Sequence, residues 1–230
     1  DLMGSITYLS VMWFSLASTS EQFTALNGAN IAIVLLITLW ALRLGTFLFM
    51  RIHKDGEDKR FRSIKPSATQ FFMTWTLQGL WVSMCSMCAL TAISSETGVV
   101  MNALFYIGLG LFIYGFCTEI IADNQKSKFR SIPENRDKFI TTGLWAKSRH
   151  PNFFGEIVLW AGIAVMSFSS LNGLQYLTLI SPVFTYLLLV YVSGVRMLEA
   201  RADKKWGQDK EYVKYKSETP VLMIKYWGRA

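Results

Sequence analysis

Cysteine is scarce in this sequence, which has three cysteines among 230 residues. Cys85 and Cys88 have the CxxC spacing, but no second pair of cysteines or histidines lies near them, so the spacing does not indicate a zinc or redox site. Both of them and Cys117 lie in apolar runs, where a free cysteine packs as a small hydrophobic side chain. We therefore expect a reducing or membrane-buried setting without disulfides.

Charged residues are also few. They make up 17% of the chain, against about 25% in soluble domains, while hydrophobic residues make up 52%. The apolar residues fall in runs long enough to cross a bilayer, which excludes an ordinary soluble domain. Linkers rich in proline, glycine or serine are lacking too, and we find no internal repeat. The sequence therefore predicts an all-α fold, a polytopic transmembrane helix bundle that forms a single domain over residues 1–230.

Six apolar runs each come close to the roughly twenty residues that a transmembrane helix needs. No signal peptide precedes the first run, and Asp1-Leu2 is not a natural beginning, so we expect further sequence upstream and seven or more spans in the full protein. The predicted spans are Gly4–Thr19, Ile31–Met50, Ala68–Ile93, Val99–Ala122, Asn152–Ser169 and Leu174–Val195.

The net charge of +7 comes from 23 lysines and arginines, whose placement follows one rule. Apart from Arg43, all of them lie in two loops, 51–66 and 123–150, and in the tail, 196–230. The loops that alternate with these carry none. Because basic residues beside membrane spans mark the cytoplasmic side, both loops and the tail are predicted to be cytoplasmic, and the charge does not indicate binding to nucleic acid.

One stretch, Gly143–Trp160, has the features of a functional site. A proline disfavours helical geometry in the residue before it and suits the first helical position, so a helix is predicted to begin at Pro151. The free N–H groups of its first turn, beside Arg149 and His150, would bind an anion such as phosphate.

Further along this predicted helix, Asn152 and Glu156 lie four positions apart and share a face, and Gly155 beside them leaves room for a flat group. Arg149, His150 and the start of this helix form what we call the corner. Glu156 would lie about 6 Å deeper than Asn152, so the corner is suited to a phosphate at its mouth and a polar ring further in. In the alternative, purely structural interpretation, Arg149 and His150 are interfacial anchors and Glu156 complements the helix dipole.

Other charges near the predicted spans also need partners. Arg43 lies well inside the second span, so it should face the bundle interior, in a structural ion pair or in a site. Glu119, Asp123, Lys126 and Arg130 follow one another at steps of four, three and four, on one helical face. Carboxylates oppose the dipole at the C-terminal end of a helix, so Glu119 and Asp123 should pair with cations or bind hydroxyl or amino groups of a ligand.

Several longer motifs resemble the steroid 5-alpha-reductase-like membrane proteins, and most closely their branch of unassigned function. The motifs are EIIADNQKSKFR at 119–130, TGLWAKSRHPNFFGEIVLWAGI at 142–163, and the LEAR and EYVKY motifs of the tail. The opening DLMGSITY and the segment WALRLGTFLFMRIHKDGEDKRF fit as well, so the resemblance covers almost the whole chain. Isoprenylcysteine carboxyl methyltransferase-like proteins are wider kin.

This resemblance implies a seven-helix bundle and an NADPH-dependent oxidoreductase that acts on a CH–CH group. In that family the cofactor lies in the cytoplasmic half of the bundle, and hydride passes to a carbon–carbon double bond conjugated to a carbonyl in a sterol-like lipid. The protein supplies orientation and electrostatics for such chemistry. The implied partners are NADPH, a lipid or sterol-like substrate and membrane lipid.

The same resemblance implies roles for individual residues of a cofactor site. The implied set is Asp123 and Lys126 for the adenosine and phosphate portion, Arg149, His150 and Asn152 for phosphate and ribose, Glu156 for the nicotinamide amide, and Arg196, Glu199 and Arg201 to close the site from the tail. We add Glu119 to this set, because it shares a helical face with Asp123 and Lys126.

The substrate half of the family pattern departs from this sequence. The steroid reductases of the family polarise the substrate carbonyl with a tyrosine shortly before an arginine, whereas the matching segment here has Trp40 before Arg43. Tryptophan donates one hydrogen bond but supplies no phenolic proton. The glutamate partner of that tyrosine would fall upstream of Asp1. The candidate catalytic residues are therefore Trp40 and Arg43, with Tyr8 as a substitute acid.

Two other functions stay open. Membrane isoprenylcysteine and phospholipid methyltransferases, which bind S-adenosylmethionine, also resemble the RHPxxxG pattern, but they usually have two adjacent glutamates where this chain has Glu199-Ala200. A non-catalytic lipid-binding membrane protein is the other alternative, because this chain has Trp40 where the steroid reductases have their tyrosine. The mixed acidic and basic residues of the ADNQK motif suit a phosphorylated dinucleotide, which favours the reductase.

Overall fold

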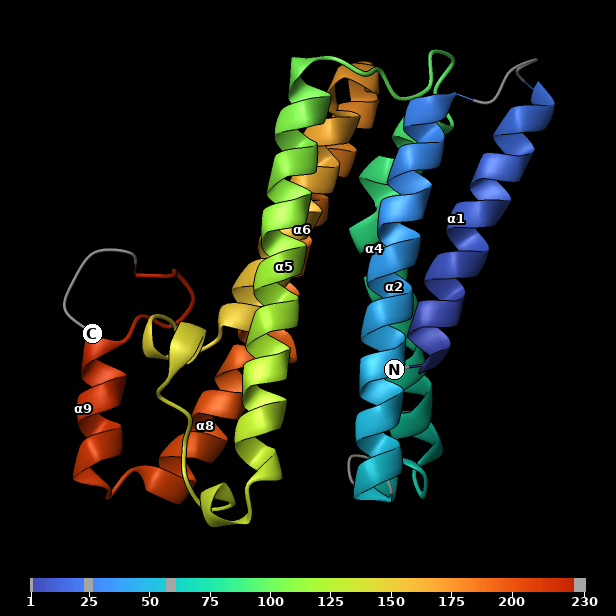
Figure 1. Cartoon of the computed structure of the whole chain (residues 1–230). Coiled ribbons are helices and arrows are strands. Elements are labelled where there is room, and N and C mark those ends of the chain that lie inside the picture. Colours follow the sequence, from blue (N-terminus) through green and yellow to red (C-terminus); the bar gives the residue numbers. More distant parts are fainter. Residues whose placement is uncertain (1, 23–26, 57–60, 226–230) are drawn as a thin grey trace. The chain divides into compact units, whose positions relative to one another are not determined.

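The computed structural model describes residues 2–22, 27–56 and 61–225, and every regular element within these ranges is helical (Figure 1). The first predicted span forms α1 (Leu2–Gln22), which has spanning length, although its many serines and threonines lower its mean hydropathy. The prediction of an all-α, multi-pass integral membrane protein is confirmed. Five segments of the described ranges are long and apolar enough to cross a membrane: Gly28–Lys54, Ala68–Ile93, Ala103–Ser131, Pro151–Ser170 and Gly173–Trp206.

Local signals set the ends of the two long helices that follow α1, which are α2 (Gly28–Asp55) and α4 (Ala68–Ile93). The Asn27 side chain caps α2 by accepting a hydrogen bond from the Ala29 N–H at 2.8 Å, and α2 ends at Gly56, whose φ of 80° suits glycine. The helix therefore runs past its predicted end at Met50. The predicted charged loop is shorter than expected and contains α3 (Phe61–Ile64), while its residues 57–60 lie outside the described residues.

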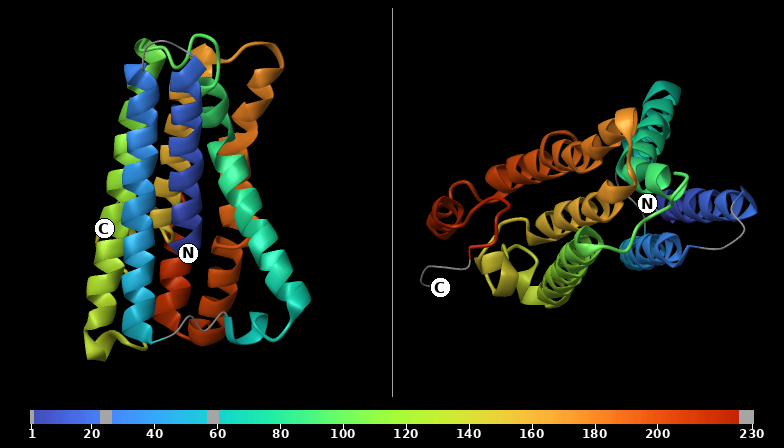
Figure 2. Two further views of the ribbon diagram at one scale, coloured as in Figure 1. Left: turned by 90° about the vertical axis from the view of Figure 1, so that its right-hand side faces the viewer. Right: turned by 90° about the horizontal axis from the view of Figure 1, so that it is seen from above.

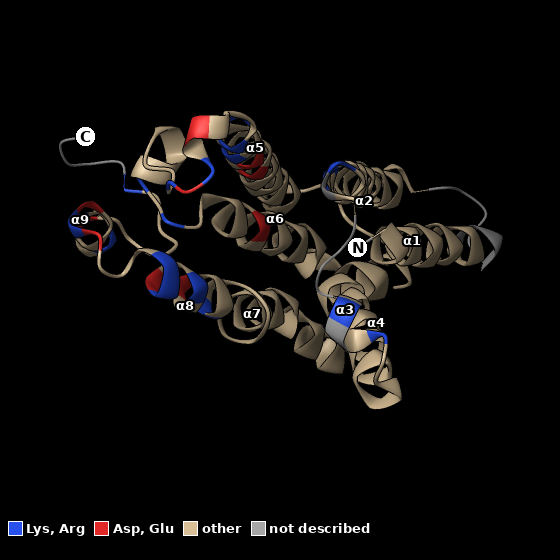
Figure 3. Cartoon of the chain, turned by 90° about the horizontal axis from the view of Figure 1, so that it is seen from below, with Lys and Arg blue, Asp and Glu red and all other residues tan. Residues whose placement is uncertain are grey.

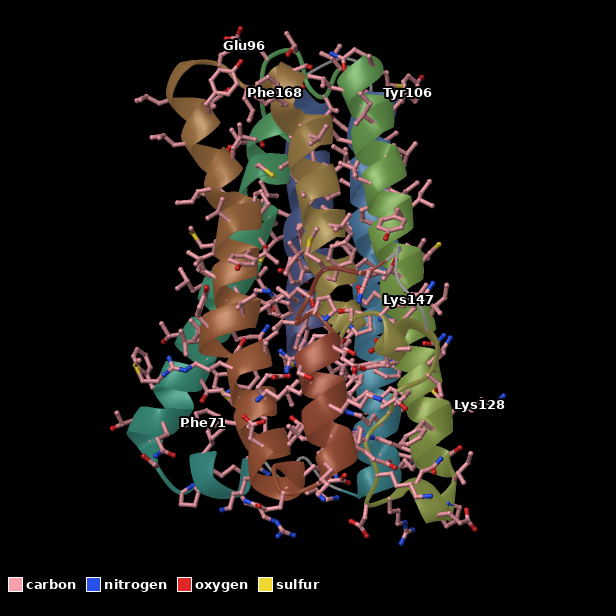
Figure 4. The ribbon with its side chains drawn as sticks, turned by 90° about the vertical axis from the view of Figure 1, so that its left-hand side faces the viewer. Phe71, Glu96, Tyr106, Lys128, Lys147 and Phe168 are labelled. Carbon is pink, nitrogen blue, oxygen red and sulfur yellow. The ribbon has the colours of Figure 1, made fainter. Side chains whose placement is uncertain are left out.

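The chain divides into two compact units. The first unit comprises residues 1–106 and 163–181, and the second comprises residues 107–162 and 182–230. In the first unit α1 packs against both α2 and α4 (Figures 1 and 2). Within that unit α4 runs from Phe71 near one end to the turn at Glu96 at the other (Figure 4). The single domain inferred from the sequence stays a prediction.

The last predicted span, Leu174–Val195, is not one continuous helix, which corrects the prediction. A Cβ on Gly194 would collide with the carbonyl oxygen of Leu189, so glycine is required where the segment breaks. π-Helical turns of this kind are frequent at functional sites. The segment consists of a 3-10 helix (Gly173–Leu179), α7 (Ile180–Leu187) and a π-helix (Leu188–Val192), and α8 (Val195–Trp206) follows the break.

The second unit contains most of α5 (Ala103–Ser131) and α6 (Pro151–Ser167), together with α8 and α9 (Lys210–Glu218). α5 continues well beyond its predicted end at Ala122, because the residues from Asp123 to Ser131 are helical rather than the start of a loop. Short 3-10 helices accompany these elements at Pro133–Asn135, Gly143–Ala146 and, in the first unit, Phe168–Ser170.

Glycines bring the backbones of α5 and α6 together in the second unit. A Cβ on Gly115 would lie 2.5 Å from the Gly155 carbonyl oxygen, and a Cβ on Gly155 would lie 2.6 Å from the Gly115 carbonyl oxygen. A Cβ on Gly162 would lie 2.6 Å from the Gly108 carbonyl oxygen in the same way. Small residues permit this close approach of membrane helices. The space expected beside Gly155 for a flat ligand is therefore filled by α5, which corrects that interpretation.

Replacing Gly115 by alanine is expected to destabilise the protein by about 1–3 kcal/mol, because the rigid backbone of α6 cannot yield to the added methyl group. Equilibrium unfolding in detergent micelles measures this change. Gly110→Ala is the matched control on the same helix, since a Cβ there meets nothing within 4 Å and should be neutral or slightly stabilising. Equal losses in the two variants would contradict the close packing of α5 and α6.

Candidate functional site

The segment before α6 is held in place by the C-terminal tail of the second unit. The helix begins at Pro151, as predicted, and the residues just before it lie alongside residues 219–225. The backbone N–H groups of Arg149 and His150 thus bond to the tail, while the His150 carbonyl accepts the Phe154 N–H of the first turn of α6 at 3.1 Å. The bonds run from Arg149 N to Pro220 O (2.9 Å), from His150 N to Val221 O (3.1 Å), from Ser148 Oγ to Leu222 O (2.8 Å) and from Lys225 N to Lys147 O (3.0 Å).

Glu199 of α8 joins the two predicted anion-binding residues. Its carboxylate accepts a hydrogen bond from Arg149 Nη1 at 2.6 Å and bonds His150 Nε2 at 2.8 Å. The side chains of Arg149, His150 and Glu199 are 10%, 7% and 19% exposed, so this pairing is largely shielded from solvent. Lys216 of α9 lies 3.8 Å from the same carboxylate and also pairs with Asp203. These residues form what we call the Glu199 cluster.

Charged side chains gather on α8, α9 and the C-terminal part of α5 (Figure 3), all of which belong to the second unit. A single acidic residue marks α6 in the same view, and Glu156 is the only acidic residue in that helix (Figure 3). Lys128, by contrast, extends outward from α5 (Figure 4).

Burial lowers the pKa of His150 below its ordinary value, although the hydrogen bond and the charge of Glu199 oppose this shift. The imidazole is therefore neutral at pH 7. Since Glu199 only accepts hydrogen bonds when ionised, Nε2 must carry the proton and Nδ1 is left as an acceptor. Within the described part of the chain, His150 Nδ1 and Arg149 Nε are buried atoms with no hydrogen-bond partner. The corner thus offers one acceptor and one cationic donor to a ligand.

The predicted face of α5 lies partly in the interior. Glu119 and Asp123 are buried and Lys126 is half-buried, while Arg130 is exposed. The ammonium of Lys126 lies 4.4 Å from the ring centre of Trp145, in a cation–π contact. Two buried carboxylates and one lysine therefore come from this face.

The loop between α5 and α6 is fastened to α5 by side-chain hydrogen bonds. Trp145 Nε1 donates to Ala122 O at 3.0 Å, and Gln125 Oε1 accepts from Leu144 N at 2.9 Å. Tyr215 of α9 donates its hydroxyl to Trp145 O at 2.7 Å. Trp145 thus connects α5 with α9, and these bonds hold its ring in the position where Lys126 contacts it.

Glu156 is buried on α6, and its neighbour Gly155 touches the backbone of Glu119. A Cβ on Gly155 would lie 2.8 Å from Glu119 N. The close packing of α5 and α6 therefore places these two buried acidic residues at one helix crossing. Burying carboxylates in a membrane protein is costly, which favours a function for them.

Some sequence-based candidates lie outside the Glu199 cluster. Arg196 and Arg201 are exposed on α8, and Asn152 is half-buried on α6. Lys216 and Asp203, in turn, belong to the cluster but were not predicted from the sequence. The spacing of Tyr212, Tyr215 and Lys216 on one face of α9 was the available signal, because such a face must lie against a neighbour.

The candidate catalytic residues lie in the first unit. Tyr8 and Trp40 are buried and make an edge-to-face ring contact with centres 5.2 Å apart. Arg43 is half-buried, and its guanidinium lies 5.2 Å from the ring centre of Phe47. The predicted inward orientation of Arg43 is thus partial, and a cation–π contact accompanies it.

Comparison with known proteins adds one family and one partial relative. The family model described as "Protein of unknown function (DUF1295)" matches residues 1–219. A probable O-methyltransferase, ustE, of Ustilaginoidea virens is 30% identical over 116 residues, which cover 44% of this chain and 41% of that relative. The chain therefore matches less than half of the curated relative. No solved structure matches this chain.

Proposed function

The chain belongs to the DUF1295 family, which comprises steroid 5-alpha-reductase-like proteins, and we propose that it is an NADPH-dependent membrane reductase. Its reaction transfers hydride to a conjugated carbon–carbon double bond of a sterol-like or other enone lipid. The observation that carries the proposal is the corner before α6, where a buried cationic donor, Arg149 Nε, and a buried acceptor, His150 Nδ1, have no partner among the described residues. The basic loop and tail support a site that faces the cytoplasm.

The residues of the corner fit the chemical groups of NADPH. The guanidinium of Arg149 suits a phosphate oxygen, and the neutral imidazole of His150 suits a ribose hydroxyl, which can donate to Nδ1. The carboxylate of Glu156 suits the amide N–H groups of nicotinamide. Asp123 and Lys126 suit adenosine and its phosphates. The cofactor, when bound, supplies the hydride, and these side chains bind and orient it.

An S-adenosylmethionine-dependent methyltransferase is the second candidate, and two observations favour it. The partial relative is named as a probable O-methyltransferase. In addition, Glu119, Asp123 and Glu156 give the buried part of the second unit an acidic character, which suits the positive sulfonium of that cofactor better than the negative charge of NADPH.

Binding of both cofactors to the detergent-solubilised protein tests the proposal. We expect NADPH to bind with micromolar affinity by nicotinamide fluorescence and S-adenosylmethionine to give no heat of binding in calorimetry. Binding of S-adenosylmethionine without binding of NADPH would instead identify the protein as a methyltransferase.

The Glu156→Gln variant tests the nicotinamide contact directly. It is expected to weaken NADPH binding about tenfold, because the amide oxygen of glutamine accepts a weaker hydrogen bond than the charged carboxylate does. 2′-Phospho-ADP-ribose lacks the nicotinamide and is the matched control ligand, so its affinity, measured by calorimetry, should not change. If both ligands lost the same affinity, Glu156 would act on the fold or on the phosphates instead.

A further inference from the structure

The first unit contains two buried polar atoms on α4 that lack a partner. They are Gln78 Nε2 and Trp81 Nε1, for which no hydrogen bond is found among the described residues. Two other indole N–H groups have acceptors: Trp13 donates to Thr38 Oγ1 at 3.1 Å in the same unit, and Trp145 donates to a backbone carbonyl in the other. The Trp81 N–H differs from these two, since it has no acceptor among the described residues.

Both groups lie on one face of α4, because positions 78 and 81 are three residues apart. That face meets α1, where a Cβ on Gly4 would collide with Gln78 Nε2 and approach the Trp81 ring to 3.5 Å. The sequence thus keeps a glycine where the amide of Gln78 needs space.

Aromatic rings surround this polar pair. The ring centre of Trp81 lies 5.4 Å from that of Tyr8 and 6.3 Å from that of Trp40, both in edge-to-face arrangements. Tyr8 and Trp40 are almost completely buried. The result is an apolar environment that contains an indole donor and an amide. The amide can present either an N–H group or an oxygen, so the pair suits a carbonyl or a hydroxyl oxygen of a ligand.

Unpaired polar groups are costly in a membrane segment, where no water is at hand to satisfy them. We propose that Gln78 and Trp81 bind the oxygen of an otherwise apolar lipid, with Tyr8 and Trp40 against its hydrocarbon skeleton. The site takes a lipid ketone or alcohol. This assignment rests on the proposed function, because it names the residues that hold the polar end of the enone substrate.

Equilibrium binding in detergent micelles without NADPH tests the assignment. The probes are radiolabelled cholest-4-en-3-one and 5α-cholestane, which has a similar skeleton but no oxygen. We expect the ketone to bind at least fivefold more tightly than the hydrocarbon. Trp81→Phe, which keeps an aromatic ring but removes the N–H group, should lose this preference, and Gln78→Leu should reduce it. Trp75→Phe, at an exposed position on the same helix, is the matched control and should keep it.

The stability of the unliganded variants separates binding from structure. The Gln78 N–H has no internal hydrogen bond to lose, so Gln78→Leu should not lower the melting temperature, whereas Trp81→Phe also loses ring contacts with Tyr8 and Trp40 and is judged by binding alone. A lower melting temperature of Gln78→Leu, or equal affinity of the wild-type protein for ketone and hydrocarbon, would overturn the assignment. Because NADPH is absent from the assay, ketone binding that depends on Trp81 would stand even if the protein failed to bind NADPH.

Discussion

Replacing Arg149 by alanine is expected to weaken NADPH binding at least a hundredfold, which corresponds to about 2.7 kcal/mol. Arg149 is held twice, by its backbone bond to Pro220 O and by Glu199, and its Nε remains available to a phosphate. A charge-assisted bond to phosphate in a shielded corner is stronger than a neutral one. Removing the guanidinium also releases Glu199, whose negative charge would then oppose the phosphates. Titration of nicotinamide fluorescence measures the loss.

Two variants make this result specific. Lys204→Ala removes an exposed cation from α8 and should change NADPH affinity less than threefold, because exposed charges contribute little. Arg149→Lys keeps the charge but not the planar fork, so it should recover only part of the affinity. If Arg149→Ala behaved like Lys204→Ala, the corner before α6 would not bind the cofactor's phosphates.

The parts of this site that could be predicted from sequence are those set by local chemistry. A proline that follows His150 fixes the start of α6, and the four-residue spacing of Glu119 and Asp123 puts them on one face of a helix. The apolar runs likewise predict the spans, because hydrophobic length decides what crosses a membrane. These features depend on residues a few positions apart.

The parts that could not be predicted depend on contacts between distant segments. Nothing near Arg149 indicates that residues 219–225 lie alongside it, about seventy positions away in the chain. The break at Gly194 lies in a run that is apolar throughout, where hydropathy does not distinguish a π-helix from an α-helix. Gly155 was predicted to leave room for a ligand, but a missing side chain equally permits two helices to pack closely. Only the position of α5 shows that Gly155 serves helix packing.

Replacing Glu199 by alanine is expected to lower the free energy of unfolding by about 3 kcal/mol. The loss arises because Arg149 keeps its charge in a shielded position without a partner, while His150 Nε2 loses its acceptor. Chemical denaturation in detergent measures it, and Glu218→Ala, at the exposed end of α9, should be neutral. Glu199→Gln should cost less than Glu199→Ala, since its amide oxygen can still accept a hydrogen bond from Arg149.

The double variant Arg149→Ala with Glu199→Ala separates the pair from its surroundings. If the cost of Glu199→Ala comes mainly from the unpaired arginine, removing both side chains should destabilise the protein less than the two single losses added together. Additive losses would mean that Glu199 stabilises the fold through His150 and Lys216 instead. In either case the Glu199 carboxylate connects α8 with the corner before α6 and with α9. Glu199 variants should therefore lose stability and ligand binding together, whereas Lys204→Ala should lose neither.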